Sequence, residues 1–299
     1  MSVIAGAYKN ISQRRRRGIK YAVEYLALRG LVGLLHVLPL DFASWLMGTL
    51  WALIAPRLSR HERALRHLAA AFPEKNGTEI KTIARNMWMQ LGRTCADSLK
   101  IERIIKAGRI DDRTGALLDP LKRVGTGIVF VSLHTGNWEF AITPTVVRGI
   151  KAAGVYQRMK NPKVDDYVVF ARRDRYPRDL FAKSATTGRI LLRVVRQGGS
   201  VAMLADLRDR RGIFVPFFEQ LAPTSTFPAL LCRSSDATLV AARTVRTAGV
   251  GFRIEVQEVA VPRTVDRDAE AATRQVHALF EQWIGEHPEQ WMWSHRRWG

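Results

Sequence analysis

Residues 128–140, Ile-Val-Phe-Val-Ser-Leu-His-Thr-Gly-Asn-Trp-Glu-Phe, constrain the fold more than any other stretch. The run opens with β-branched and aromatic side chains, which is typical of a buried strand, and a polar group follows directly. This pattern places His134 at the C-terminal end of the strand. Gly136 allows a tight turn, and Asn137 is a good N-cap for a helix that begins near Trp138. In open α/β sheets this carboxyl edge is where ligands bind.

His134 and Glu139 form a His-x4-Glu pair across the turn. A neutral imidazole can take a proton from a hydroxyl group, and a carboxylate within reach can hold the ring and stabilise the imidazolium that forms. In an isolated motif the commoner case is a surface histidine near a helix start, where the glutamate merely favours the helix dipole. The motif therefore indicates His134 as a candidate general base, and this assignment needs support from the rest of the chain.

The composition indicates a globular protein with anionic partners. The chain has 299 residues, of which 47% are hydrophobic, and this is enough for one large domain or two small ones. The formal net charge of +20 predicts polyanionic partners such as nucleic acid, anionic lipid or an acidic carrier protein. The only cysteines, Cys95 and Cys232, suit a reducing compartment and lack the spacing of metal ligands.

Residues 1–56 are predicted to form basic and apolar helices that associate with a membrane. Arginines 14–17 precede an apolar region, but its longest uninterrupted run, residues 42–55, is shorter than the roughly 20 residues that a spanning helix needs. Arginines 57, 60, 63 and 66 follow it, so neither a single-pass orientation nor a signal peptide fits well. We expect an interfacial or re-entrant hairpin on anionic lipid. The alternative is a soluble helical pair packed against the domain.

Residues 57–299 are predicted to form an α/β domain, with a central mixed sheet flanked by helices. Residues 57–118 look mostly helical, and strands alternate with helices after Gly125. Further strands are expected at 151–157, 200–205, 237–244 and 252–259, and helices at 188–197 and 270–284. The strand at 200–205 ends at Asp206, so a strand again leads into polar residues.

Two later segments combine arginines with aromatic residues. Residues 206–212 form a charged loop, and the apolar residues 213–218 follow it. The arginines could hold an anionic head while the aromatic wall receives an acyl chain; a loop packed on an edge strand would look the same. The tail at 291–299 could stack on bases or lie at a membrane interface.

Several ordered motifs together resemble the lipid A biosynthesis late acyltransferases of the lauroyl and myristoyl type. The first motif is Leu-His-Thr-Gly-Asn-Trp-Glu at 133–139, and the last is Trp-Ser-His-Arg-Arg-Trp at 293–298. Between them lie Tyr156 with residues 160–162, Asp206 with residues 212–218, and the segment 224–226. The resemblance extends upstream to residues 63–73. It implies a sheet like that of the glycerolipid acyltransferases and an inner-membrane enzyme whose catalytic domain faces the cytoplasm. The implied reaction moves a fatty acyl group from acyl carrier protein onto a hydroxyl of a lipid A precursor in lipopolysaccharide biosynthesis.

The resemblance also assigns candidate residues. It makes His134 the general base and Glu139 its orienting partner, with Asp206 as the rival for that role. It calls for no cofactor, metal or covalent acyl-enzyme, and no Gly-x-Ser-x-Gly elbow occurs. The candidate substrate-binding residues are Asn137, Trp138, Tyr156, Arg158, Asn161, Asp206, Arg208, Arg211, Phe217, Phe218, Arg296 and Arg297.

The chain departs from the family pattern at three positions. Gln157 stands where an arginine commonly follows the tyrosine, Leu207 where glutamine often follows the aspartate, and Glu219 where glycine often follows the two phenylalanines. These changes bear on acyl-chain choice and acceptor details more than on the reaction class.

Two alternative functions stay open at this point. The same residues could acylate another membrane glycolipid or a lysophospholipid. A basic nucleic-acid-binding protein would also explain the charge and the terminal tryptophans, but no recognised nucleic-acid motif occurs, so we expect no nucleic-acid partner.

Overall fold

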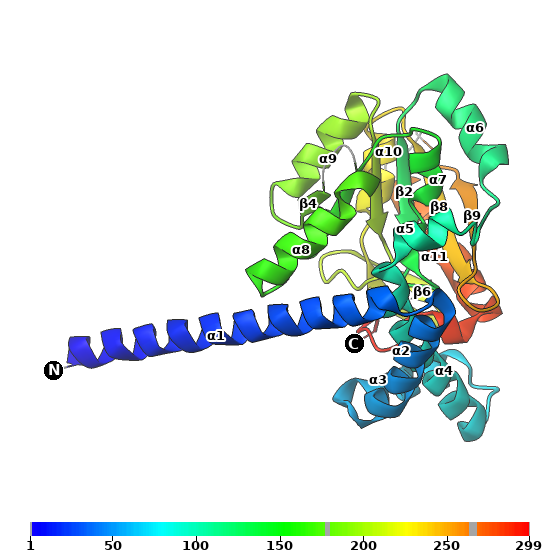
Figure 1. The fold of residues 1–299 in the computed structure, drawn as a ribbon. Helices are drawn as coiled ribbons and strands as arrows, with labels where there is room; N and C mark the ends of the chain where they lie inside the picture. Colours follow the sequence, from blue (N-terminus) through cyan, green and yellow to red (C-terminus); the bar gives the residue numbers. More distant parts are fainter. Residues whose placement is uncertain (1, 177–179, 263–267, 299) are drawn as a thin grey trace.

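A seven-stranded mixed sheet forms the centre of the protein (Figure 1). The computed structural model describes residues 2–176, 180–262 and 268–298, with side-chain surroundings from residue 16 onward apart from residue 268. The strand order is β1-β9-β8-β2-β5-β3-β4, and only β8 and β9 pair in antiparallel fashion. The strands are β1 (Ile110–Asp112), β2 (Ile128–Ser132), β3 (Ala152–Tyr156), β4 (Leu180–Ala182), β5 (Ser200–Leu204), β8 (Thr238–Arg246) and β9 (Phe252–Val259). The predicted α/β fold with a central mixed sheet flanked by helices is confirmed.

Helices cover both faces of the sheet, which explains the unbroken apolar run of β2. Val129, Val131 and Leu133 belong to the larger core, whereas Ile128 and Phe130 belong to a second core on the opposite face. A strand buried on both faces must be apolar at every position. The helices are α1 (Ser2–Val37), α2 (Leu40–Ile54), α3 (Ser59–Ala71), α4 (Gly77–Ser98), α5 (Ile101–Lys106), α6 (Gly115–Val124), α7 (Thr143–Val147), α8 (Pro162–Arg172), α9 (Thr187–Arg196), α10 (Phe227–Arg233) and α11 (Asp268–Glu286).

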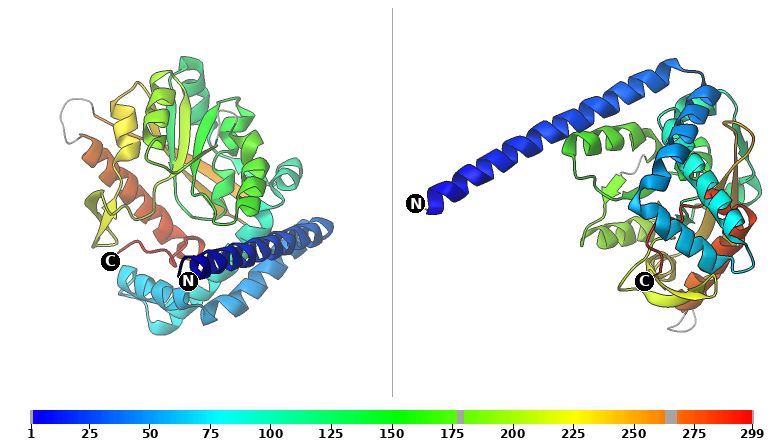
Figure 2. Two further views of the ribbon diagram at one scale, coloured as in Figure 1. Left: turned by 90° about the vertical axis from the view of Figure 1, so that its left-hand side faces the viewer. Right: turned by 90° about the horizontal axis from the view of Figure 1, so that it is seen from below.

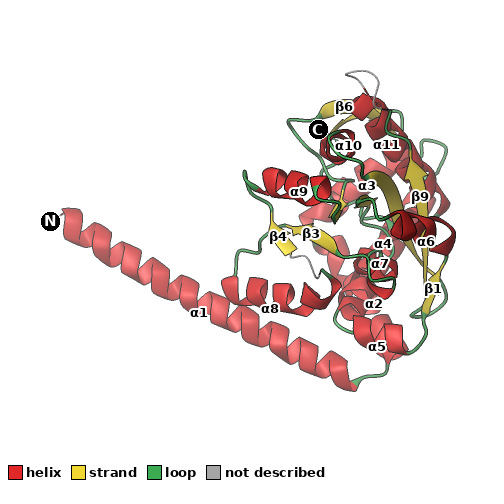
Figure 3. Ribbon diagram, turned by 90° about the horizontal axis from the view of Figure 1, so that it is seen from above, coloured by secondary structure: helices red, strands yellow, loops and turns green. Residues whose placement is uncertain are grey.

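The N-terminal helix α1 extends away from the body of the protein, as Figure 1 and the right-hand view of Figure 2 show. Seen from above, α8 lies alongside it (Figure 3). Asn161, the N-cap of α8, joins the two helices because its Nδ2 donates to the carbonyl of Tyr21 at 2.9 Å and to Glu24 at 3.0 Å. None of the helices in the described parts of the chain combines the length and the apolar character needed to cross a bilayer.

The second helix, α2, packs closely against α4. Gly92 of α4 permits this contact, since a Cβ atom there would collide with the carbonyl of Met47. The Asp41 carboxylate adds a link to the sheet by accepting from the backbone N–H of Val250 at 2.9 Å. The packing of α2 thus crosses the predicted boundary between residues 1–56 and 57–299.

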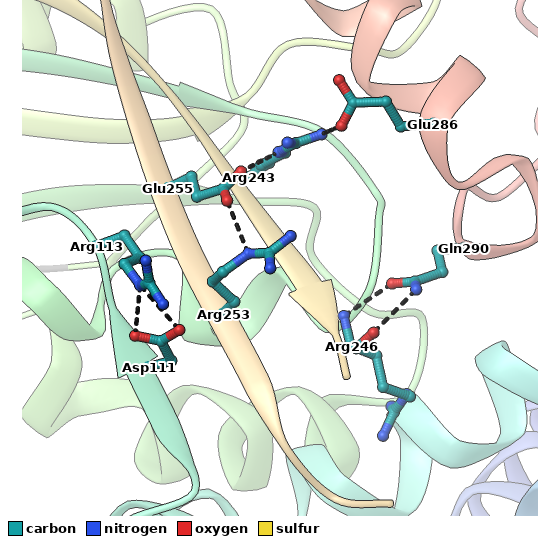
Figure 4. A network of polar contacts seen from close by, with 8 residues as sticks. All are labelled: Asp111, Arg113, Arg243, Arg246, Arg253, Glu255, Glu286 and Gln290. Atoms are coloured by element: carbon teal, nitrogen blue, oxygen red, sulfur yellow. Dashed lines mark hydrogen bonds and ion pairs between the residues drawn. The ribbon is translucent and has the colours of Figure 1, made fainter. Parts of the chain in front are cut away.

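The C-terminal tail is attached to the loop that follows β2. The Gln290 side chain brackets the backbone of Arg246 at the end of β8, accepting at 2.8 Å and donating at 3.1 Å (Figure 4). The backbone of Gln290 accepts from Gly136, and Met292 donates to the carbonyl of His134. Gly136 has a φ of +55° and lies directly against Thr244, so a side chain has no room there. These contacts fix the position of the His134 loop.

A polar network joins β8, β9 and α11 beside this attachment. Arg243 is largely buried and pairs with Glu255 of β9 at 2.6 Å and Glu286 of α11 at 2.5 Å, and Arg253 also contacts Glu255 (Figure 4). A buried guanidinium needs such partners. The network therefore holds α11, and the tail that follows it, against the sheet.

A separate two-stranded hairpin contains the predicted aromatic wall. β6 (Ile213–Phe217) and β7 (Gln220–Thr224) are antiparallel and are joined by Phe218 and Glu219. Phe217 and Phe218 are buried and contact Trp291 and Trp293, respectively. The two rings therefore pack in the aromatic core. This packing accounts for the apolar character of residues 213–218, and contact with an acyl chain is not needed to explain it.

The hairpin turn is strained at Glu219. Phe218 and Glu219 have φ values of +49° and +59°, although a turn of this kind favours glycine or asparagine. Because Glu219 is exposed, we expect Glu219→Gly to stabilise the protein by about 1 kcal/mol, or about 2 °C in thermal unfolding. Glu219→Ala, which removes the same side chain without freeing φ, serves as the control. Equal stability of both variants would refute this account.

Candidate active site

His134 and Asp206 meet at the carboxyl edge of the sheet. His134 follows β2 and Asp206 follows β5, and these two strands are parallel neighbours. Nδ1 of His134 lies 2.8 Å from Oδ1 of Asp206, and the backbone N–H of His134 donates to Oδ2 at 2.8 Å. Asp206 therefore holds both the ring and the backbone of the histidine.

Asp206 is a buried carboxylate with a complete set of donors. Asp206 is 1% exposed, and Nε1 of Trp291 donates a further hydrogen bond to its Oδ2 at 2.8 Å. Burial alone would raise the pKa of Asp206, but attraction to His134 and the hydrogen bonds from His134 and Trp291 hold this pKa well below its usual range. The group is thus ionised throughout the neutral and mildly acidic range.

This arrangement determines which nitrogen of the His134 ring carries the hydrogen. A carboxylate can only accept, so Nδ1 carries the hydrogen that faces Asp206. Nε2 is then the basic nitrogen. A neutral imidazole oriented in this way can take a proton from a hydroxyl group, and the carboxylate stabilises the imidazolium that results.

Glu139 does not orient the ring, contrary to our expectation from the motif. Arg172 donates to Oε2 of Glu139 from Nε at 3.0 Å and makes a second hydrogen bond to Oε1, and Arg175 lies 3.4 Å from Oε2. The expected helix start is a 3-10 turn (Trp138–Phe140), and the Glu139 carboxylate within it pairs with the two arginines instead of with the histidine. Asp206 takes the place that the motif predicted for Glu139.

Two aromatic rings flank His134. The ring of Trp138 lies edge-on at 4.8 Å between centroids, and the ring of His295 lies at 5.1 Å. Burial and the neighbouring His134 lower the pKa of His295 to about 4, so His295 is uncharged at neutral pH. Its Nε2 is buried with no hydrogen-bond partner among the described residues.

The two predicted asparagines have structural contacts. Asn137 is fully buried, and its Oδ1 accepts from Glu139 N–H and from Ser98 at 3.2 Å, which shapes the loop after β2. Asn161 is 5% exposed and caps α8 while binding α1. Both side chains are buried.

Tyr156 is the last residue of β3 and Arg158 follows it, two strands away from β2 and His134 in the sheet order. Tyr156 donates to Asp165 at 3.1 Å, and Arg158 is exposed at 3.7 Å from the same carboxylate. Arg158 lines an open cavity of about 300 Å³ together with Lys183 and Thr187. This cavity opens where β3 and β4 end, at the same carboxyl edge as His134.

The remaining predicted arginines divide between the surface and the core. Arg211 and Arg296 are exposed, and Arg208 is partly buried. Arg297 is 1% exposed, donates to Pro223 and Thr224, and stacks on Phe217. Arg297 therefore contacts protein rather than an anionic substrate, contrary to our expectation.

Three kinds of contact around the site were not predicted from the sequence. Trp291 and His295 approach from the C-terminal tail, and Glu139 is bound by Arg172, the last residue of α8, and by Arg175, in the 3-10 turn that follows α8. The Trp-Ser-His-Arg-Arg-Trp motif was a usable signal for His295, because a histidine among arginines is easily kept uncharged. No local pattern signals the arginines of α8.

Within the described residues, no group of three or more His, Cys, Asp or Glu side chains is arranged to hold a metal ion.

The fold and the site define an α/β protein that carries a histidine–aspartate pair at the carboxyl edge of a mixed sheet. The sequence matches the bacterial lipid A biosynthesis acyltransferase family over residues 10–299, so the chain belongs to this family. The resemblance seen in the motifs is thereby confirmed.

Two relatives carry matching names. Over 247 residues the chain is 24% identical to lipid A biosynthesis acyltransferase 2 of Shigella flexneri, covering 79% of this chain and 77% of that protein. Over 175 residues it is 29% identical to lipid A biosynthesis lauroyltransferase of Escherichia coli (strain K12), covering 57% of this chain and 54% of that protein. The second match thus spans about half of each chain.

Proposed function

We propose that the protein transfers a fatty acyl group from acyl carrier protein to a hydroxyl group of a lipid A precursor in lipopolysaccharide biosynthesis. Membership of the family supports the reaction class. The hydrogen bond between His134 and Asp206 is the observation that carries the mechanism.

In this mechanism His134 is the general base and Asp206 is its orienting partner. Nε2 of His134 removes the proton from the acceptor hydroxyl while the oxygen attacks the thioester carbonyl. The tetrahedral intermediate collapses with cleavage of the carbon–sulfur bond, and His134 returns the proton to the thiolate that leaves. The acyl group passes directly to the acceptor, so the protein itself is never acylated.

An acceptor panel tests the substrate class. We expect transfer from acyl-acyl carrier protein to a lipid A disaccharide precursor and little transfer to lysophospholipids. The reverse preference would favour the second candidate, acylation of another membrane lipid through the same histidine. That candidate has the same base and differs only in the acceptor.

We further propose that the protein acts at the inner membrane, with the catalytic domain on the cytoplasmic side and the α1–α2 hairpin in the lipid interface. One face of α2 packs on α4, and the opposite face exposes large apolar side chains, including Phe42, Trp45, Leu53 and Ile54. A soluble surface rarely exposes so many together, whereas tryptophan is enriched at membrane interfaces.

A charge on this face is expected to release the protein from membranes. Trp45 and Leu53 are 51% and 56% exposed, so Trp45→Glu with Leu53→Glu removes apolar area without touching the core. We expect most of the double variant to leave the pellet in vesicle sedimentation at moderate salt. Val124→Glu is the control, because Val124 is 71% exposed at the end of α6, distant from α2 in Figure 1. Sedimentation equal to that of the control would contradict the proposal.

A further inference from the structure

Three arginines lie along α3. Arg60, Arg63 and Arg66 recur every third residue, so Arg63 is a neighbour of each of the other two on the helix surface. Arg60 and Arg66 are exposed, and Arg63 is partly buried.

The C-terminal tail brings a fourth arginine to this row and links it to His134. Arg63 donates to the carbonyl of Ser294 at 3.1 Å, and the His67 ring lies 3.0 Å from the carbonyl of Trp293. Arg296 follows in the same tail segment and is exposed. Between Ser294 and Arg296, the His295 ring lies 5.1 Å from that of His134. The row therefore borders the proposed base.

The four guanidinium groups have no acidic partner within residues 16–176, 180–262 and 269–298. Glu62 on the same helix is exposed and forms no ion pair with them. Burial lowers the pKa of Arg63, and repulsion from Arg296, Arg60 and Arg66 lowers it further, so the other three charges lie within electrostatic reach of Arg63. Such a cluster becomes favourable when an anion with several oxygens lies between the charges.

The surface next to the row indicates where that anion comes from. Leu53, Ile54 and Leu58, which precede α3 directly, are exposed and continue the apolar face of α2. An anion held by these arginines lies beside this apolar face, and Arg60 and Arg63 are within electrostatic reach of His295, whose ring contacts that of His134. A lipid with a phosphorylated head fits this setting better than a protein surface does.

We propose that Arg60, Arg63, Arg66 and Arg296 form a subsite for a phosphate group on the sugar headgroup of the acceptor lipid. The subsite positions the acceptor so that its hydroxyl group reaches His134. This inference rests on the proposed function, because it assigns the anion to the acceptor of the same reaction.

Binding of a phosphorylated disaccharide lipid, measured without any acyl donor in neutral detergent micelles, tests the subsite. Arg60→Gln with Arg66→Gln is the test variant, because Arg63 also anchors the tail through Ser294. We expect the dissociation constant to rise at least tenfold for the phosphorylated lipid and to change less than twofold for its dephosphorylated form. Arg123→Gln, at an exposed position on α6, is the matched control.

Each other outcome is decisive. An unchanged dissociation constant for the phosphorylated lipid would refute the proposed subsite. An equal loss of affinity for the phosphorylated and dephosphorylated lipids would refute it as well. If the double variant binds more weakly than wild type only when anionic phospholipid is mixed into the micelles, the arginines contact the bulk membrane surface and the proposed subsite is refuted. A higher KM for acyl carrier protein alone would assign the arginines to the carrier. A wild-type protein that binds the lipid but transfers no acyl group would refute the proposed function and leave the subsite standing.

Discussion

His134→Ala is expected to lower kcat/KM for acyl transfer about 1,000-fold, because it removes the only group proposed to take the proton of the acceptor hydroxyl. The ring makes one side-chain hydrogen bond, to Asp206, and lies at the surface of the core, with 10% of its side chain exposed. The fold should therefore survive the change. The measurement is steady-state transfer from acyl-acyl carrier protein, with thermal unfolding recorded for each variant.

His134→Gln separates chemistry from packing in the same experiment. Glutamine keeps a polar side chain of similar size but cannot serve as a base near neutral pH. We expect its activity to match that of His134→Ala. Activity within tenfold of wild type in either variant would exclude His134 as the general base.

Asp206→Asn is expected to lower kcat/KM by 100-fold or more, since the amide cannot stabilise the imidazolium and can present a donor to Nδ1. The Asp206 carboxylate also accepts from the His134 backbone and from Trp291. Asp206→Ala would leave these buried donors unpaired and should lower stability as well, by about 1–3 kcal/mol for each donor. Asparagine is therefore the sharper probe of catalysis.

Glu139→Gln is the matched control for Asp206→Asn, because each substitution replaces a carboxylate with the amide of the same length. Glu139 binds Arg172 and Arg175, so its loss should loosen α8 and reduce activity much less than Asp206→Asn does. A greater loss at Glu139 than at Asp206 would restore the assignment that the His-x4-Glu motif first suggested.

The pH dependence of stability follows from the lowered pKa of Asp206. A folded-state pKa below the unfolded value adds stability that is fully present above the unfolded pKa, about 3.9, and is lost as the pH falls through the folded pKa. Asp206 therefore contributes its full share of stability at every pH well above the unfolded pKa. Acid inactivation above pH 5 must come from other groups.

Local sequence patterns predicted the strand that carries His134 and the mixed α/β sheet around it. The pattern of β2 was informative because burial on both faces leaves no room for polar residues. The partner of His134 could not be read from spacing. Asp206 lies 72 positions away and reaches the ring only because β5 pairs with β2.

The contribution of the tail was also hidden from local patterns. Trp291 and His295 reach the site because Gln290 brackets Arg246 and the tail then pairs with the loop after β2. The Phe217–Phe218 pair suggested an acyl-binding wall, but both rings are buried among tryptophans of that tail. An aromatic run looks the same in sequence whether it contacts a ligand or the core.

Mass spectrometry of a single-turnover reaction tests the direct transfer most simply. Wild-type protein is mixed with acyl-acyl carrier protein and a phosphorylated lipid A precursor, and both the lipid and the intact protein are weighed. We predict that the lipid gains one acyl group while the protein mass stays unchanged at every time point. A protein that carries the acyl group before the lipid does, or a lipid that is never acylated, would contradict the account.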